Sequence, residues 1–180
     1  MRPWILPLAL AAALLAAGEE RPAVTRAVLA GFERKLDRTI PTLDVNDPYE
    51  LLGTARGIYL PGYGVVFTTE ISLVFSNYSP FNLPPAGPGL EKLREKKMAR
   101  LPQLKRSMRA LLVMAAASLD AVPPNEQIVL GISLYNRSFE NREGLPSQIV
   151  MQAPRQTLLD LKLERIDSPK LEQAIRVQEL

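Results

Sequence analysis

The longest regular pattern in the sequence is a helical region that runs from Leu90 to Leu119. Its apolar residues recur at steps of three and four, and they are Leu101, Leu104, Met108, Leu111, Ala115 and Leu119. Such a stripe avoids water only if it is covered, so it predicts a long helix packed on the face of another layer. Pro102 interrupts the pattern, and we expect either a kink or two helices meeting there. After Leu111 the sequence is apolar almost all round, which indicates burial on more than one side.

Three segments rich in β-forming residues are expected to supply that other layer. Residues 54–75 predict a β-hairpin or a bent pair of strands, because Pro61 and Gly62 form a turn signal in the middle. The second of these strands alternates, and its inward positions are Phe67, Thr69, Ile71, Leu73 and Phe75. Residues 127–135 and 148–153 predict two further strands.

Shorter segments complete the expected order of elements. Residues 21–38 predict a first helix, and Asp47 and Pro48 are expected to start a helical turn that runs through Leu52. Residues 76–89 are rich in proline, asparagine and glycine and predict a long loop. Two helical segments, 155–163 and 169–177, are expected at the end of the chain.

The predicted order is therefore α-ββ-α-ββ-α, which favours an α/β domain of the α+β type. Strands that are joined by short connections favour antiparallel pairing. We expect one antiparallel sheet of about four strands, flanked by helices, with the long helix on one face. In element order alone this resembles the profilin-like and roadblock-like sandwiches, and a likeness of fold implies no function.

The N-terminal residues have the layout of a cleaved signal peptide. Arg2 is basic, residues 4–15 carry no charge, and Ala16, Ala17 and Gly18 supply the small residues that a signal peptidase requires. A membrane-spanning helix needs roughly 20 apolar residues, and this run is shorter. We therefore predict a signal peptide over residues 1–18 and a single globular domain over 19–180. The domain would be exported, periplasmic or secreted, and would have no transmembrane span.

Two absences in the composition restrict the chemistry. The sequence has no cysteine, which excludes disulfides, thiolate nucleophiles and thiolate metal ligands. It has no histidine, which excludes Ser-His-Asp catalysis and zinc sites that use imidazole. We accordingly predict no metal and no cofactor. An exported chain without disulfides also fits a bacterial envelope better than a eukaryotic secreted module.

A segment with two tyrosines, Tyr59 and Tyr63, surrounds the predicted hairpin turn. Tyrosine offers a flat apolar face and a hydroxyl group, so these side chains are candidates for a binding edge. The glycine spacing does not match a phosphate-binding loop. The alternative, which we prefer, is a turn whose glycines adopt positive φ and whose tyrosines pack on neighbouring strands.

The first part of the long helix is strongly basic. Only Glu91 and Glu95 oppose its cations, which are Lys92, Arg94, Lys96, Lys97, Arg100, Lys105, Arg106 and Arg109. These residues are candidates for binding an envelope protein or an anionic surface. Nucleic acid is not expected, because the segment lacks aromatic residues for base stacking. The alternative is a solvated helix face.

Carboxylates are the remaining candidates for catalysis. Glu70 lies on a predicted strand, and Asp120 and Glu126 flank the second pair of strands. A glycosidase would need two such groups roughly 5–10 Å apart across a cleft. The sequence does not establish that any two of them face each other.

These observations favour an exported, non-catalytic binding or interaction domain. The first alternative is a carboxylate-based hydrolase that acts on an envelope polymer. The second is a structural or oligomerising envelope subunit. A cleft that holds two facing carboxylates would favour the hydrolase over the binding domain.

Overall fold

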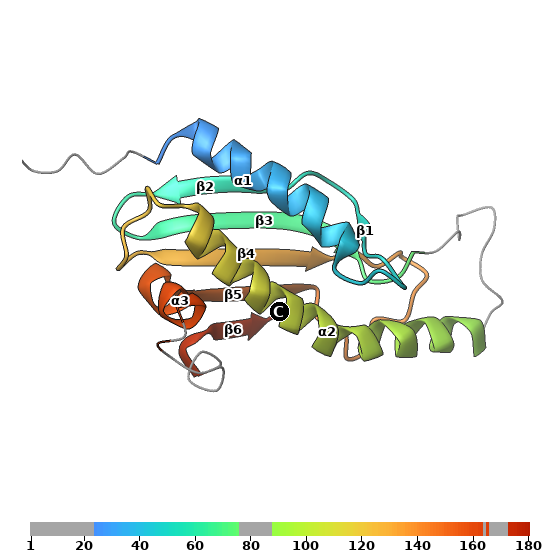
Figure 1. Ribbon diagram of the computed structural model, residues 1–180. Coiled ribbons are helices and arrows are strands. Elements are labelled where there is room, and N and C mark those ends of the chain that lie inside the picture. Colours follow the sequence, from blue (N-terminus) through green and yellow to red (C-terminus); the bar gives the residue numbers. More distant parts are fainter. Residues whose placement is uncertain (1–23, 76–87, 164, 166–172) are drawn as a thin grey trace, which may run out of the picture.

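The computed structural model describes residues 24–75, 88–163, 165 and 173–180, which form helices on a six-stranded sheet (Figure 1). The helices are α1 (Arg26–Thr39), α2 (Pro88–Ser118) and α3 (Arg155–Lys162), and a 3-10 turn, η1 (Ile40–Thr42), follows α1. The strands are β1 (Glu50–Leu51), β2 (Arg56–Leu60), β3 (Gly64–Ser72), β4 (Gln127–Leu134), β5 (Gln148–Pro154) and β6 (Arg176–Glu179). The mixed α/β fold with a sheet flanked by helices is therefore as predicted.

The sheet differs from the prediction in its strand count and at its centre. Its order is β1-β3-β4-β5-β6, and β2 pairs with β3 beside β1. All neighbours are antiparallel except β3 and β4, which run parallel from Gly64 and Gln127 to Ile71 and Leu134. The expected antiparallel sheet of about four strands is wrong in these two respects. The chain reaches β4 from β3 through α2, and a helical crossover of this kind brings the two strands into the same direction.

The two additional strands come from segments that were expected to be helical. Instead of a helical turn before Leu52, β1 pairs with the end of β3, and the Leu52 N–H donates to the Glu70 carbonyl at 3.0 Å. Of the helix expected over 169–177, residues 169–172 lie outside the described residues, Gln173 and Ala174 are helical, and Arg176 and Val177 belong to β6. In both places a sheet edge offers unpaired backbone groups, and pairing with it outweighs a weak local tendency to form helix.

Several predicted features lie partly or wholly outside the described residues. They are the signal peptide over 1–18, the first residues of the helix expected from Arg21, and most of the loop over 76–89. Helix α1 begins at Arg26, where the Thr25 hydroxyl accepts a hydrogen bond from the Val28 N–H at 3.3 Å. Within the described ranges, no helix combines the length and the apolar character needed to cross a membrane.

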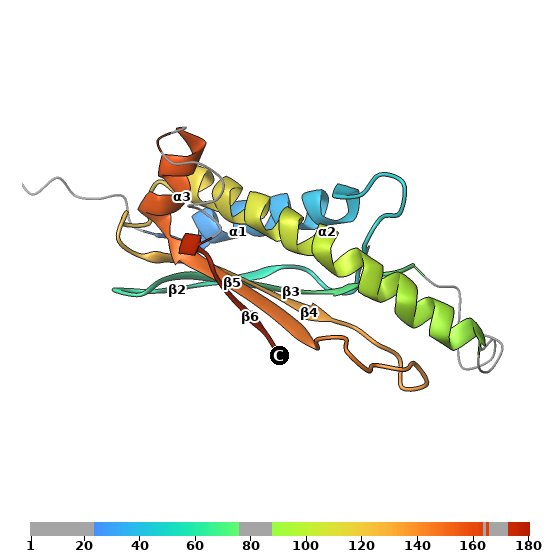
Figure 2. The ribbon, with the colours of Figure 1, turned by 90° about the horizontal axis from the view of Figure 1, so that it is seen from below.

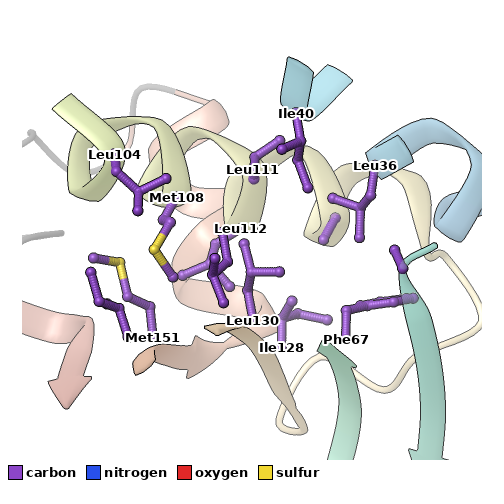
Figure 3. Close-up of a cluster of buried hydrophobic side chains, with 14 of the residues drawn as sticks. Leu36, Ile40, Phe67, Leu104, Met108, Leu111, Leu112, Ile128, Leu130 and Met151 are labelled. Carbon is purple, nitrogen blue, oxygen red and sulfur yellow. The ribbon is translucent and has the colours of Figure 1, made fainter. Parts of the chain in front are cut away.

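The helices all lie on one face of the sheet, and the core fills the space between the two layers. Figure 2 shows α1, α2 and α3 on the same side of the strands. Figure 3 shows the centre of the core, where Phe67, Leu130 and Met151 of the sheet meet side chains of α1 and α2. All six residues of the predicted helical stripe, from Leu101 to Leu119, are buried. The long helix packed on a sheet is thus confirmed.

Helix α2 is continuous through Pro102, so of the two alternatives expected there, a kink or two separate helices, the second is wrong. Proline removes one hydrogen bond from a helix interior, and tertiary contacts have to compensate for that loss. Those contacts lie on the adjacent turn, where Lys97, Arg100 and Leu101 are all buried. The first half of α2 runs past the ends of the strands and depends on these contacts (Figures 1 and 2).

Helix α1 is fixed to the edge strand β2 through Gly57. The Gly57 N–H donates to Glu33 Oε1 at 2.6 Å, and Arg26 donates to the Gly57 carbonyl at 3.1 Å. The ring of Phe67 lies against Gly57 from the neighbouring strand, so a Cβ at Gly57 would collide with it. That ring packs on Phe32 of α1, with a centroid distance of 4.8 Å. Glycine is therefore required for both the ring pair and the contact between α1 and β2.

Replacing Gly57 should destabilise the fold by steric collision. In Gly57→Ala the Phe67 ring has to move inside a packed core, which we expect to cost about 1–3 kcal/mol of unfolding free energy. Gly53→Ala is the matched control, because nothing lies within 4 Å of a Cβ there. Urea denaturation of both variants measures the difference. Equal stability of the two variants would contradict the assigned role of Gly57.

The contact between α1 and β2 also contains a buried carboxylate. Glu33 is only 5% exposed and accepts hydrogen bonds from both Arg26 and Gly57. Burial alone would raise the pKa of the Glu33 carboxyl, but these hydrogen bonds outweigh burial and hold the pKa below its ordinary value of 4.5. The ionised form is therefore the one that stabilises the fold.

The sign of this shift predicts an acid-dependent loss of stability. Glu33 contributes fully above pH 4.5, and its contribution disappears as the pH falls through its lower pKa in the folded state. Glu33→Gln should cost about 1–3 kcal/mol of unfolding free energy at neutral pH. The cost should be much smaller at a pH below the pKa of Glu33 in the folded state. The free energies of unfolding of wild type and Glu33→Gln, measured from neutral pH to below pH 4.5, test this prediction. Glu95→Gln, at an exposed position of α2, should show no such pH-dependent difference.

Candidate functional site

Eight basic residues of α2 were predicted to bind an anionic partner, and two of them are buried and contact other parts of the fold. Lys97 is 2% exposed and forms an ion pair with Glu140, whose side chain is 5% exposed. The Lys97 ammonium also donates to Asn136 Oδ1 at 2.9 Å and to the Tyr135 carbonyl at 3.4 Å. Arg94 donates to the Glu143 carbonyl from one turn earlier. Together these bonds fasten the loop between β4 and β5 to α2.

Arg100, three residues after Lys97, likewise joins α2 to other parts of the fold. Its guanidinium donates to the carbonyls of Leu73 and Asp47, and it lies 3.3 Å from the Asp47 carboxylate and 3.6 Å from that of Asp44. It also stacks over the Tyr49 ring at 4.3 Å, a cation–π contact. Burial raises the pKa of the Tyr49 hydroxyl, so that side chain stays neutral. Arg100 thereby joins α2 to the segment before β1 and to the end of β3.

The positive charge expected along α2 is therefore largely balanced from within the fold. Five of its eight predicted basic residues form ion pairs: Arg94 with Glu91, Lys96 with Asp47, Lys97 with Glu140, Arg100 with Asp44 and Asp47, and Lys105 with Glu179. Lys92, Arg106 and Arg109 form none with the described residues. A role for α2 in binding an anionic partner stays a prediction, and it rests on these last three residues.

The two hairpin tyrosines and one of the candidate carboxylates lie together. The Glu126 side chain is buried and accepts hydrogen bonds from the Tyr59 hydroxyl at 3.2 Å and from the Gly62 N–H at 3.0 Å. Gly62 has a φ of 80°, as the predicted turn requires. Tyr63 approaches Gln152 across the sheet, with 3.4 Å between their side-chain oxygens. Burial and the hydrogen bond to Glu126 raise the pKa of the Tyr59 hydroxyl. In this arrangement Glu126 holds the tip of the β2–β3 hairpin.

The other candidate carboxylates lie in different surroundings. Glu70 is exposed on β3 and pairs with Ser133, whereas Glu126 precedes Gln127, which pairs with Gly64. The offset of six residues between these register positions corresponds to about 20 Å along the sheet. Asp120 is exposed, and its carboxylate contacts Arg155 at 3.2 Å. Among the described residues, no group of three acidic side chains is arranged to hold a metal ion.

A concave surface that the sequence did not indicate lies on the outer side of the helical layer. Two adjoining hollows share Lys35, and we call them together the interhelical groove. The first is lined by residues of α1 and the second mainly by residues of α2; in full they are Gly31, Arg34, Lys35, Arg38, Thr39, Ala110, Val113, Met114, Ala117, Ser118 and Lys162. The Lys35 ammonium donates to the Ser118 hydroxyl at 3.0 Å and connects the two walls.

The lining of the interhelical groove combines cations with apolar groups and contains no acidic residue. Arg34, Lys35, Arg38 and Lys162 are all exposed, and none of them forms an ion pair with a described residue. The sequence did carry one signal for this site, the cations of α1 at spacings of one and four. It could not show that α2 and the end of α3 lie beside them.

No family model, no curated protein and no solved structure matches this chain. The chemistry of its surface therefore has to be inferred from its own residues.

The buried ion pair of Lys97 predicts a strong and local effect on stability. Lys97→Met leaves the Glu140 carboxylate buried without its cation, and we expect a loss of about 3–5 kcal/mol of unfolding free energy. Lys92→Met is the matched control on the same helix, because Lys92 is exposed, and it should change stability by less than about 0.5 kcal/mol. Urea denaturation measures both losses.

The double variant Lys97→Met/Glu140→Leu separates loss of the ion pair from loss of packing. It removes the stranded charge and should recover part of the stability that Lys97→Met loses. A single variant as stable as the Lys92→Met control would contradict the assigned role of Lys97.

Proposed function

We propose that this chain is an exported, non-catalytic domain that binds an anionic partner in the cell envelope through its helical layer. The observation that carries the proposal is the interhelical groove, which is lined by four exposed cations and no acidic residue. Export is supported by the sequence of residues 1–18 alone. The partner would be an envelope protein or another anionic surface.

The distribution of charge supports this placement of the binding surface. Cations that already have acidic partners at close range contribute little to the field felt by an approaching anion. That applies to Lys96 and Lys105 of α2, and still more to the buried Lys97 and Arg100. It does not apply to Arg34 and Arg38 in one hollow or to Lys162 in the other, because none of them has such a partner among the described residues.

The geometry of the candidate acids gives no comparable support to a hydrolase. A general acid and a general base have to face each other across a substrate site. Glu126 is engaged by the hairpin tip, Glu70 lies about 20 Å farther along the sheet by its register, and Asp120 contacts Arg155. None of the three lines the interhelical groove.

The test measures binding of two polyanionic probes to residues 19–180. These are poly-L-glutamate and phosphatidylcholine vesicles with or without phosphatidylglycerol. At low ionic strength we expect binding of at least one anionic probe, and the affinity should fall steeply as salt screens the charges. Failure to bind either anionic probe at low salt would contradict the proposal.

A pair of variants with equal net charge locates the surface. Arg34→Gln/Arg38→Gln/Lys162→Gln removes three groove cations and should weaken binding at least about tenfold, or about 1.4 kcal/mol. Arg94→Gln/Lys96→Gln/Lys105→Gln removes three cations with acidic partners and should weaken it much less. Equal losses would show that net charge alone governs binding, which would contradict the role of the groove.

A further inference from the structure

The interhelical groove extends over the surfaces of two neighbouring helices. Its walls are α1 and α2, which run in opposite directions over neighbouring parts of the sheet (Figure 1). Helix α1 contacts β2, whereas α2 contacts β4 and β5, so the two helices cover different strands of the sheet. Lys162, at the end of α3, belongs to the lining beside the last turn of α2. The groove follows the helices and is open to solvent on its outer side.

The floor of the groove is apolar, and apart from Met114 its side chains are short. Val113, Met114 and Ala117 of α2 are half-buried, and Ala110 is exposed one turn before them. Gly31 lines the adjoining hollow on α1 and presents no side chain at all. Short side chains allow the backbone of another helix to approach closely, and methionine adapts its shape to an incoming side chain.

The rim of the groove is cationic on both sides. Arg34 and Arg38 are one helical turn apart on α1, so their Cβ atoms are about 6 Å from each other. Lys162 stands at the far wall. Lys35 crosses the groove to the Ser118 hydroxyl, and this neutral partner leaves its charge uncompensated. Carboxylates one turn apart on a bound helix would meet Arg34 and Arg38 in register.

These features disfavour a lipid as the occupant. A membrane surface is bound by apolar side chains that protrude from a convex face, whereas the apolar residues here form a recessed floor. A single acyl chain requires a pocket that encloses most of its surface, and this groove is open along its outer side. A helix needs neither of these, because it buries only one stripe in a groove.

We propose that the interhelical groove binds an amphipathic α-helix of a partner protein, with its apolar stripe on the floor and acidic residues against the cationic rim. This inference rests on the proposed function and specifies its partner. It commits to helix-in-groove recognition, in which apolar contacts provide much of the affinity and the cations select acidic sequences.

The test uses a designed peptide as the probe. It has about 18 residues and a side-chain staple, because short isolated helices are marginal in water. Leucines form one stripe and glutamates flank it. A second peptide with the same composition keeps its charge, but its leucines are spread around the helix. Fluorescence anisotropy with residues 19–180 should show that the striped peptide binds at least about tenfold more tightly than the scrambled one.

A variant that changes the floor and keeps every cation distinguishes this inference from general anion binding. Ala110→Gln/Ala117→Gln retains good helix formers and the full charge, but places polar side chains on the floor. It should lose at least about tenfold of its affinity for the striped peptide while still binding poly-L-glutamate. Ala99→Gln, at an exposed alanine of α2 outside the groove, is the control and should leave peptide binding unchanged. Circular dichroism establishes that each variant is folded.

The binding of these probes to wild type and to the floor variant separates the helix inference from the proposed function. If wild-type protein binds poly-L-glutamate but does not distinguish the two peptides, the helix inference is wrong and the proposed function stands. If the floor variant binds the striped peptide as well as wild type does, the groove is not the site of the peptide and the helix inference is wrong. Should the floor variant lose binding to phosphatidylglycerol vesicles and retain the striped peptide, the occupant is a lipid. If neither poly-L-glutamate, anionic vesicles nor the striped peptide binds, both proposals fail together.

Discussion

The buried pair of cations, Lys97 and Arg100, determines what the long helix can do in this protein. One turn of α2 places Lys97 against the loop after β4 and Arg100 against the segment before β1. These contacts hold the first half of α2 beyond the ends of the strands, where little of the sheet supports it (Figure 2). Burying a charge is unfavourable unless it is paired and hydrogen-bonded, and both residues meet that condition. Lys97 and Arg100 therefore stabilise the fold, whereas the exposed cations of the helical layer are accessible to the proposed anionic partner.

The parts of the fold that follow from periodicity could be predicted. The stripe from Leu101 to Leu119, the hairpin at Gly62 and the strands β4 and β5 all have patterns that extend over several turns or several alternations. Strands β1 and β6 could not be predicted, because their conformation is set by the sheet edges they pair with. The parallel pairing of β3 and β4 depends on the direction in which the chain returns after α2, and a local pattern does not contain that information.

The candidate site was predicted less well, for a related reason. The sequence identified the residue types that could act, including Tyr59 and Glu126, but assigned them to separate sites, and their hydrogen bond across 3.2 Å unites them. The sequence also presented the cations of α2 as one basic segment, because they follow one another in the chain. Whether a lysine is free or paired depends on acids that are distant in sequence, as Glu140 is from Lys97. The groove combines residues of three helices, and only packing on a common sheet brings them together.

The two walls of the groove are held both by the sheet and by each other. Helix α1 is held to β2 by Glu33 and Arg26 through Gly57, and α2 is held to β4 and β5 by its apolar stripe. The spacing of the walls is therefore set by the sheet together with the direct contacts between α1 and α2, among them the bond between Lys35 and Ser118. A site whose walls are held in this way exists before any ligand arrives, and a preformed site loses less free energy to reorganisation on binding. The same reasoning assigns the edge contact at Gly57 a role beyond stability, because a shift of α1 on β2 would change the width of the groove and hence what can bind in it.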